Sequence, residues 1–375
     1  MLRTPCRIGA LALVAALANV SSAAAPIRDN ADLDSYLAHV APGESPLDRL
    51  SPPARKRFLA TFRTGTFSWS DLEAELTRDE AAAILKLFAL ESLLPSMRFR
   101  TSHLPIGASE TAEASARFDA LSAALSGSAG RDAAAAYRGW FAQRQSEATL
   151  RRLSDGDVAL VLRAALAVAA IEPSLETRDV LADLAELERR GIVAPAWIGS
   201  IYRAFVERRD FAAAAALRER HPDANLPEPP LLRDEAHGDG PTVLDATDDG
   251  RTLVRRTLVL EPSQVIVVAG CHFSKDAVRD IEADPALRTA FSRHVIWITP
   301  ADGDPADPAL AQWNHEHPLA AMRTVYRANE WPSIDSWAMP TFYFLRNGRV
   351  ESKVSGWQGQ RDAVMDGFHR IGLGP

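Results

Sequence analysis

The chain has 375 residues, of which 47% are hydrophobic and 24% are charged, and its formal net charge is -7. These proportions are typical of folded soluble proteins, so they exclude wholesale disorder, a collagen-like repeat and a polytopic membrane protein. The negative charge, without any long basic run, gives no support for a nucleic acid or an anionic membrane as partner. The length favours two domains.

Residues 1–24 are interpreted as a cleaved secretory signal peptide. Arg3 and Arg7 form a short basic region, residues 8–20 are apolar, and residues 22–24 are small residues ahead of a cleavage point before Ala25. The apolar run is shorter than the roughly 20 residues that span a bilayer, and no comparable run follows. We therefore expect export to the periplasm or another extracytoplasmic space, with no membrane span after cleavage; an uncleaved membrane anchor is the alternative.

The chain has two cysteines, and export would leave one. Cys6 lies inside the predicted signal peptide, so its removal leaves Cys271 alone. The mature chain then cannot form an internal disulfide. In an oxidising compartment a single remaining thiol is either buried and inert or kept for bonds to other molecules.

Residues 25–225 predict an all-α domain, built as a stack of helical hairpins. Apolar residues recur at helical spacing throughout this region, and Ser70 with Glu73 and Thr77 with Glu80 have the spacing of capping boxes. Nothing here assembles acids, bases or metal ligands. The region is therefore interpreted as a scaffold or a protein-binding surface.

Residues 226–241 are rich in Pro and Gly and predict a linker, after which the pattern changes to strands within a C-terminal α/β domain of residues 242–375. The continuous apolar run at 265–269 is typical of a strand buried on both faces of a sheet. We expect strands at 242–247, 252–260, 265–269, 294–299, 341–345 and 349–354, and helices after Ser274 up to Pro285, around 308–328 and at 360–371.

This order of elements, with Cys271 at the first buried strand-to-helix junction and a proline just before a later strand, resembles the thioredoxin fold over residues 242–375. The best-matching pieces are VIVVAGCHFS at 265–274 and Met339-Pro340-Thr341. The added strands before residue 265 resemble the exported thioredoxin-like proteins of the TlpA and redoxin type. The resemblance implies a cis bond at Pro340 beside a reactive sulfur, with Phe273, Met339 and Thr341 as the residues that contact the substrate.

The chain departs from that family at three positions. The usual C-x-x-C motif is Cys271-His272-Phe273-Ser274, so a hydroxyl replaces the resolving thiol. Ser274 cannot attack a mixed disulfide, and a dithiol cycle within one chain is excluded. The buried acid that thioredoxins carry six residues before the cysteine is Val265, and the tryptophan before the cysteine is Gly270.

The remaining thiol is a candidate nucleophile. A cysteine at a helix N-terminus, with His272 and Lys275 nearby in sequence, is favoured as its thiolate. The C-x-F-S string also resembles monothiol glutaredoxins and the retention proteins of the endoplasmic reticulum. We therefore predict intermolecular thiol–disulfide exchange by Cys271, in the manner of a monothiol oxidoreductase, with protein thiols or disulfides and an external low-molecular-weight thiol as partners and no cofactor.

Two other functions stay open at this point. In the first, the thioredoxin fold is redox-inactive and serves as a binding or adaptor protein. In the second, His315 and His317 supply imidazoles beside Cys271 and His272, a donor set that suits copper or zinc. Exposure and reactivity of the thiol separate the first alternative from the redox function.

Overall fold

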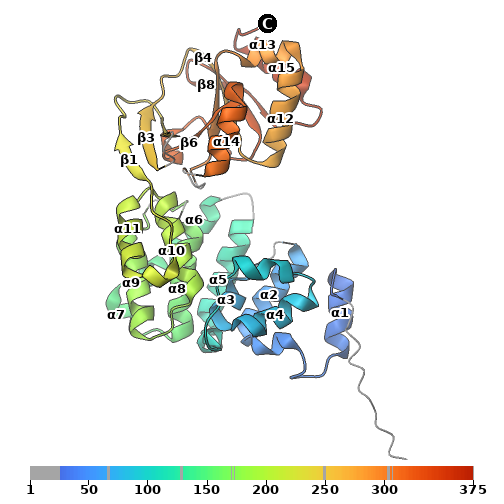
Figure 1. The fold of residues 1–375 in the computed structure, drawn as a ribbon, viewed down its shortest axis with the longest axis vertical. Helices are drawn as coiled ribbons and strands as arrows, with labels where there is room; N and C mark the ends of the chain where they lie inside the picture. Colours follow the sequence, from blue (N-terminus) through green and yellow to red (C-terminus); the bar gives the residue numbers. More distant parts are fainter. Residues whose placement is uncertain are drawn as a thin grey trace, which may run out of the picture.

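The computed structural model describes residues 26–65, 68–126, 130–169, 171–172, 174–247, 251–301, 305 and 307–374. It has a helical N-terminal half and a C-terminal half that contains a sheet (Figure 1). The predicted signal peptide, residues 1–24, lies outside the described residues. In the described part of the chain, no helix combines the length and the apolar character needed to cross a membrane.

The helical half contains two clusters of buried apolar side chains. One is formed by α1 to α4 and the segments between them, and the other chiefly by α5 to α11. The elements are α1 (Asn30–His39), η1 (Pro46–Arg49), α2 (Pro52–Thr64), α3 (Ser70–Glu75), α4 (Arg78–Leu87), η2 (Glu91–Ser96), η3 (Ile106–Ser109), α5 (Ala112–Ser126), α6 (Gly130–Trp140), η4 (Ala142–Arg144), α7 (Glu147–Leu150), α8 (Asp155–Val168), α9 (Thr177–Arg189), α10 (Pro195–Glu207), α11 (Phe211–Arg220) and η5 (Pro222–Ala224).

Of the two predicted capping boxes, one is present and one is wrong. Thr77 caps α4, its hydroxyl accepting from the backbone N–H of Glu80 while the Glu80 carboxylate accepts from the N–H of Thr77. By contrast, α3 already includes Ser70, whose hydroxyl accepts a hydrogen bond from Arg163. The Ser70 hydroxyl therefore bonds to a side chain far away in sequence and does not form the cap of α3 that the spacing had suggested.

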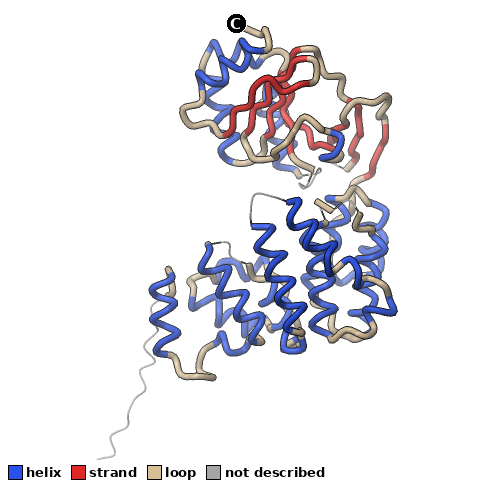
Figure 2. Tube along the Cα trace, turned by 180° about the vertical axis from the view of Figure 1, so that it is seen from behind, coloured by secondary structure: helices blue, strands red, loops and turns tan. Residues whose placement is uncertain are grey.

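An eight-stranded mixed sheet organises the C-terminal half, in the order β1-β3-β2-β6-β5-β4-β7-β8. Figure 2 shows strands of this half in red. β4, β5 and β6 run parallel, and β7 and β8 complete one side as antiparallel strands. The elements are β1 (Leu231–Asp234), β2 (Thr242–Ala246), β3 (Thr252–Thr257), β4 (Ser263–Val268), α12 (His272–Ala283), α13 (Pro285–Phe291), β5 (Val295–Thr299), α14 (Pro308–Glu316), η6 (Pro318–Ala320), β6 (Met322–Val325), η7 (Ala328–Glu330), β7 (Thr341–Arg346), β8 (Arg349–Ser355) and α15 (Arg361–Arg370).

β4 is buried on both faces, as its continuous apolar run predicts. Val265 and Val267 pack with α12, α13 and α15, whereas Ile266 and Val268 pack on the other face with Trp331. The strand order β5-β4-β7-β8, with α12 connecting β4 to the parallel β5, is the arrangement expected of a thioredoxin-like α/β domain. The chain is thus a helical half followed by a thioredoxin-like sheet.

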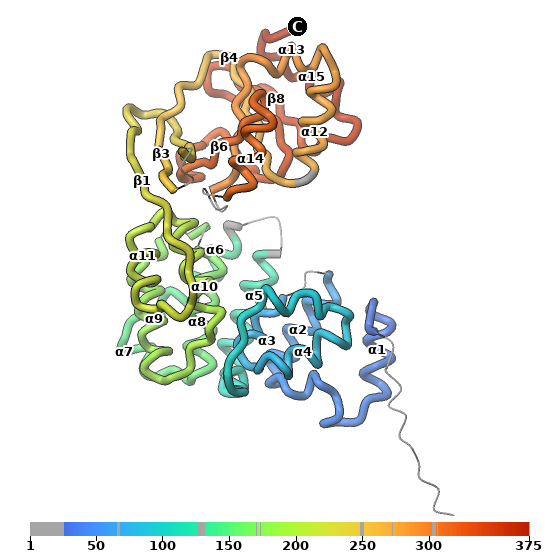
Figure 3. The backbone as a smooth tube through the Cα atoms, viewed as in Figure 1, coloured from blue at the N-terminus to red at the C-terminus, as the bar shows by residue number. Residues whose placement is uncertain are grey.

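Several segments differ from the prediction. The predicted strand at 252–260 ends at Thr257, and a further helix, α13, follows the helix predicted up to Pro285. The expected helical region at 308–328 contains α14 but then forms β6, which pairs with β5 on one side and β2 on the other. The segment 226–241, predicted as a linker, contributes β1, which pairs in parallel with β3 (Figure 3). Both strands have four residues and little apolar alternation, so their pairing with distant partners decides their structure. The predicted turn at 248–250 lies outside the described residues.

The two halves share a packed boundary. Leu244 and Leu253 of the sheet belong to the same buried apolar cluster as α8 to α11, and Tyr326 packs against that cluster. Burial of apolar side chains from both halves in one cluster stabilises their relative position.

Candidate functional site

Cys271 lies where β4 passes into α12. Gly270 has a φ of 142°, a backbone conformation that a side chain rarely tolerates, and Cys271 then serves as the N-cap residue of α12. A Cβ atom added to Gly270 would approach the sulfur of Met339 to 3.3 Å. Glycine at this position therefore lets the chain turn sharply and lets the Met339 side chain lie against the backbone.

The Cys271 sulfur has two polar neighbours. Its Sγ lies 3.4 Å from the hydroxyl oxygen of Ser274 and 3.4 Å from the carbonyl oxygen of Met339. Ser274 is fully buried, and its oxygen accepts a hydrogen bond from the N–H of Gly270 at 3.2 Å. Because that bond occupies only an acceptor site of the hydroxyl, the Ser274 proton is able to point at the sulfur. The sulfur in turn is placed to donate its own proton to the carbonyl oxygen of Met339.

The loop before β7 supplies the other wall of the site. The Met339–Pro340 bond is cis, as the resemblance implies, and Thr341 is fully buried as the first residue of β7, opposite Val268. The Thr341 hydroxyl donates to the carbonyl oxygen of Ala338 at 2.7 Å. This bond and the pairing of β7 with β4 hold the Met339 carbonyl beside the sulfur.

The site is open to solvent although the helical half contacts the same edge of the sheet. β4, β5 and β6 are parallel, so their carboxyl ends share one edge, and the helical half contacts that edge beyond β5 and β6. Cys271 is nevertheless partly exposed, Phe273 is 47% exposed and Met339 is 37% exposed. Two apolar side chains therefore flank an accessible thiol.

The remaining predicted residues do not all gather at the sulfur. His272 begins α12, and its side chain lies outside what the structure describes. The ammonium of Lys275 lies over the Trp313 ring at 5.6 Å, and His317 stacks on the same ring while its Nδ1 contacts the carboxylate of Glu282. His315 is exposed on α14. Among the described residues, no three His, Cys, Asp or Glu side chains are grouped so that they could hold a metal ion.

Sequence reasoning missed two groups of this site. Both are backbone atoms: the N–H of Gly270, which orients the Ser274 hydroxyl, and the carbonyl of Met339, which faces the sulfur. The glycine before the cysteine was the available signal for the first, because a residue without Cβ permits the sharp turn. The resemblance placed Met339 near the substrate, but it did not indicate a carbonyl contact with sulfur.

Comparisons with known proteins give little more. No protein-family model matches the chain, and no curated protein matches it. Among solved structures, it is similar to a thioredoxin-like protein from Bacteroides caccae, at 12% sequence identity and a TM-score of 0.22, over 62% of this chain and 83% of that one. A likeness at that TM-score supports no inference about the site or its activity.

Proposed function

We propose that this protein is an exported thioredoxin-like protein of the TlpA and redoxin type, which takes part in intermolecular thiol–disulfide exchange through Cys271. The observation that carries the proposal is the position of a partly exposed sulfur at the start of α12, 3.4 Å from a buried hydroxyl and 3.4 Å from the carbonyl oxygen of Met339. In disulfide exchange the attacking form is the thiolate, and the exposed part of the Cys271 side chain is where a client sulfur can approach it. The strands β2 and β3 ahead of β4 are the feature that favours the exported type.

In the proposed step, the Cys271 thiolate attacks one sulfur of a client disulfide. The client S–S bond breaks, a bond forms between Sγ and the attacked sulfur, and the departing client sulfur leaves as a thiolate that takes a proton from water. One disulfide is consumed and one is formed, so the exchange has no net oxidation. An external low-molecular-weight thiol then attacks the mixed disulfide, because Ser274 supplies no second thiol.

The test uses the full chain with Cys6→Ser, so that Cys271 is its only thiol. After the protein is expressed and its thiols are trapped with an alkylating agent, non-reducing gels should show covalent adducts that Cys271→Ser abolishes. Ser274→Cys should shorten the life of the adducts and raise reductase activity in an insulin assay, because a neighbouring thiol can now release the client. Ser274→Ala is the matched control: it removes the hydroxyl without adding a thiol, so its adducts should form more slowly and persist.

The alternative is a redox-inactive binding or adaptor protein. If the wild-type chain forms no adducts that depend on Cys271, and Ser274→Cys gains no reductase activity, the exchange function is wrong and the adaptor function takes its place. Export is tested separately, by fusing residues 1–40 to an alkaline phosphatase that is active only outside the cytoplasm. The fusion should be active, and an arginine in place of Val14, within the apolar run, should abolish that activity.

A further inference from the structure

A polar cleft of about 340 Å³ lies in the helical half, in a part of the chain for which the sequence indicated no site. It lies where the apolar cluster formed by α1 to α4 meets α10, a helix of the other apolar cluster of that half. This volume is near the lower end of the roughly 300–1,000 Å³ of small-molecule sites, which are often found where two packed units meet. Its lining includes Trp69, Glu73, Arg98, Gly199, Ser200 and Arg203.

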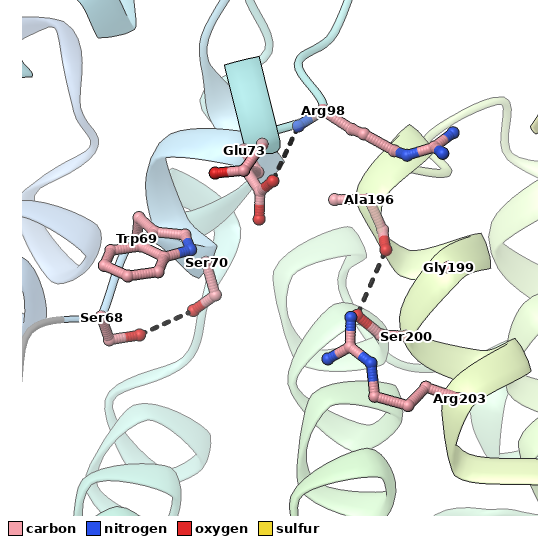
Figure 4. A pocket seen from close by; sticks show the side chains of 10 residues that line it. Ser68, Trp69, Ser70, Glu73, Arg98, Ala196, Gly199, Ser200 and Arg203 are labelled. Carbon is pink, nitrogen blue, oxygen red and sulfur yellow. Dashed lines mark hydrogen bonds between the residues drawn. The ribbon is translucent and has the colours of Figure 1, made fainter. Parts of the chain in front are cut away.

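The two walls of the cleft carry opposite charges. Glu73 of α3 lies on one side with the Trp69 ring, and Arg203 of α10 lies on the other with Ser200 (Figure 4). Arg98, from the segment after η2, also lines the cleft, and its guanidinium donates to the carbonyl oxygen of Ala224. A simple anion would meet the carboxylate of Glu73, and a simple cation would meet the guanidinium of Arg203. A ligand with one charge of each sign satisfies both walls.

Glu73 is held in place within this cleft and is partly removed from water. One of its carboxylate oxygens accepts a hydrogen bond of 2.8 Å from the backbone N–H of Arg98. Burial raises the pKa of Glu73 above its ordinary value, although the Arg98 N–H and the charges of Arg203 and Arg98 oppose this. A ligand cation beside the carboxylate would offset the same desolvation of its charged form.

Gly199 leaves space on the α10 wall. Ala196, Gly199, Ser200 and Arg203 recur at helical spacing, so they share one face of α10. A Cβ atom added to Gly199 would meet no atom within 4 Å, whereas a larger side chain there would extend into the cleft. The position therefore allows the cleft to be filled without disturbing the packing around it.

We propose that this cleft binds a small zwitterion of the amino-acid or dipeptide class, with its carboxylate on Arg203 and its ammonium group on Glu73. The Ser200 hydroxyl donates to the carbonyl oxygen of Ala196 at 3.2 Å and keeps an acceptor site for an N–H of such a ligand, and Trp69 lines the same wall as Glu73. This site is independent of Cys271, since it is built from the helical half alone.

The test is titration calorimetry on the full chain with L-alanyl-L-alanine as the probe. The dipeptide should bind, and its N-acetyl form and its C-terminal amide should each bind about tenfold or more weakly, because each loses one charged hydrogen-bonding group. Glu73→Gln should weaken binding of the dipeptide while leaving binding of the N-acetyl form unaffected. Arg203→Gln should weaken binding of the dipeptide while leaving binding of the C-terminal amide unaffected. These matched pairs separate loss of a contact from loss of the fold.

Gly199→Leu should abolish binding by filling the cleft. Gly139→Leu is the control, since Gly139 is a helical glycine that, like Gly199, has open space around it, but it lies on α6 and outside the cleft lining. The proposal is overturned if the dipeptide does not bind, if both blocked forms bind as well as the dipeptide, or if Gly199→Leu binds it normally. Binding of inorganic phosphate through Arg203 without binding of the dipeptide would make the cleft an anion site and would equally overturn the proposal.

Discussion

Arg209 donates a hydrogen bond of 2.8 Å from its Nη2 to the carbonyl oxygen of Ala301, and so joins the helical half to the loop that follows β5. The same nitrogen lies 3.3 Å from the carbonyl oxygen of Val325 at the end of β6. Arg209 is 6% exposed, in the turn between α10 and α11. One side chain of the helical half thus contacts two neighbouring strand ends, at the edge of the sheet where Cys271 also lies.

Replacing Arg209 should weaken the contact between the helical half and the sheet. Its φ of 63° is left-handed, so Arg209→Gly keeps the backbone unstrained while removing the bonds to Ala301 and Val325. We expect the free energy of unfolding to fall by about 2 kcal/mol, the range for a hydrogen bond from a charged group, as measured by urea denaturation. Proteolysis should also become faster within residues 226–241. Unchanged stability and unchanged cleavage would show that apolar packing alone holds the halves together.

Gly270→Ala should distort the turn that positions Cys271. An added Cβ would combine an unfavourable φ with a 3.3 Å contact to the Met339 sulfur, and backbone strain of this kind costs of the order of 1–3 kcal/mol. Thermal unfolding measures the loss. Gly199→Ala is the control, since that glycine is helical with open space around it, and there alanine should stabilise the protein by roughly 0.5–1 kcal/mol. Equal effects at both positions would contradict the role given to Gly270.

The pH dependence of stability should change when Asp183 becomes Asn. Burial raises the pKa of Asp183 well above its ordinary value of 3.8, only partly opposed by the hydrogen bond that Gln145 donates to it at 3.1 Å. The folded protein therefore holds a proton that the unfolded chain releases above pH 3.8, so stability falls as the pH rises from there towards the folded-state pKa.

An asparagine can keep the bond from Gln145 without that penalty. Asp183→Asn should therefore be more stable than the wild type at pH 7, and the difference should shrink as the pH approaches 4, in urea denaturation measured across this range. Parallel pH profiles for the two proteins would show that Asp183 titrates normally in the folded state.

Arg57 should be essential to the helical half. It is buried and contacts both Asp71, at 2.8 Å, and Glu110, at 2.7 Å, so Arg57→Met leaves two buried carboxylates with less compensation. Removing one partner of a buried pair typically costs about 3–5 kcal/mol. The neighbouring Lys56→Met breaks only an exposed pair with Asp119 and should cost less than about 1 kcal/mol in the same denaturation measurement. Similar losses for the two variants would count against the buried network.

Several features were predictable from the sequence because their causes are local. The capping box of Thr77 and Glu80 needs only residues three apart, and the apolar run at 265–269 needs only to be buried on both faces. The replacement of the second thiol of the motif by Ser274 is a covalent fact of the chain. It excludes a dithiol cycle within the C-x-x-C positions without any knowledge of packing.

Other features depend on partners far away in sequence. Residues 322–325 carry no strand pattern of their own, yet β2 and β5 pair with them on both sides. Ser70 has the spacing of a cap but bonds instead to Arg163, which lies 93 residues away. A hydrogen bond from a distant side chain can replace a local one, so spacing alone predicts the cap that is possible and not the one that forms.

The residue identities fix which chemistry the chain offers: cysteines at positions 6 and 271, a hydroxyl three residues after Cys271, and a helical region without a recognisable site. Packing, in contrast, leaves the thiol partly exposed, joins the helical half to the same edge of the sheet through Arg209, and places Glu73 and Arg203 along one cleft. The two differ because the atoms that are able to react are set by the covalent identity of each residue. Exposure, charge pairing and clefts arise from contacts between segments that only packing brings together.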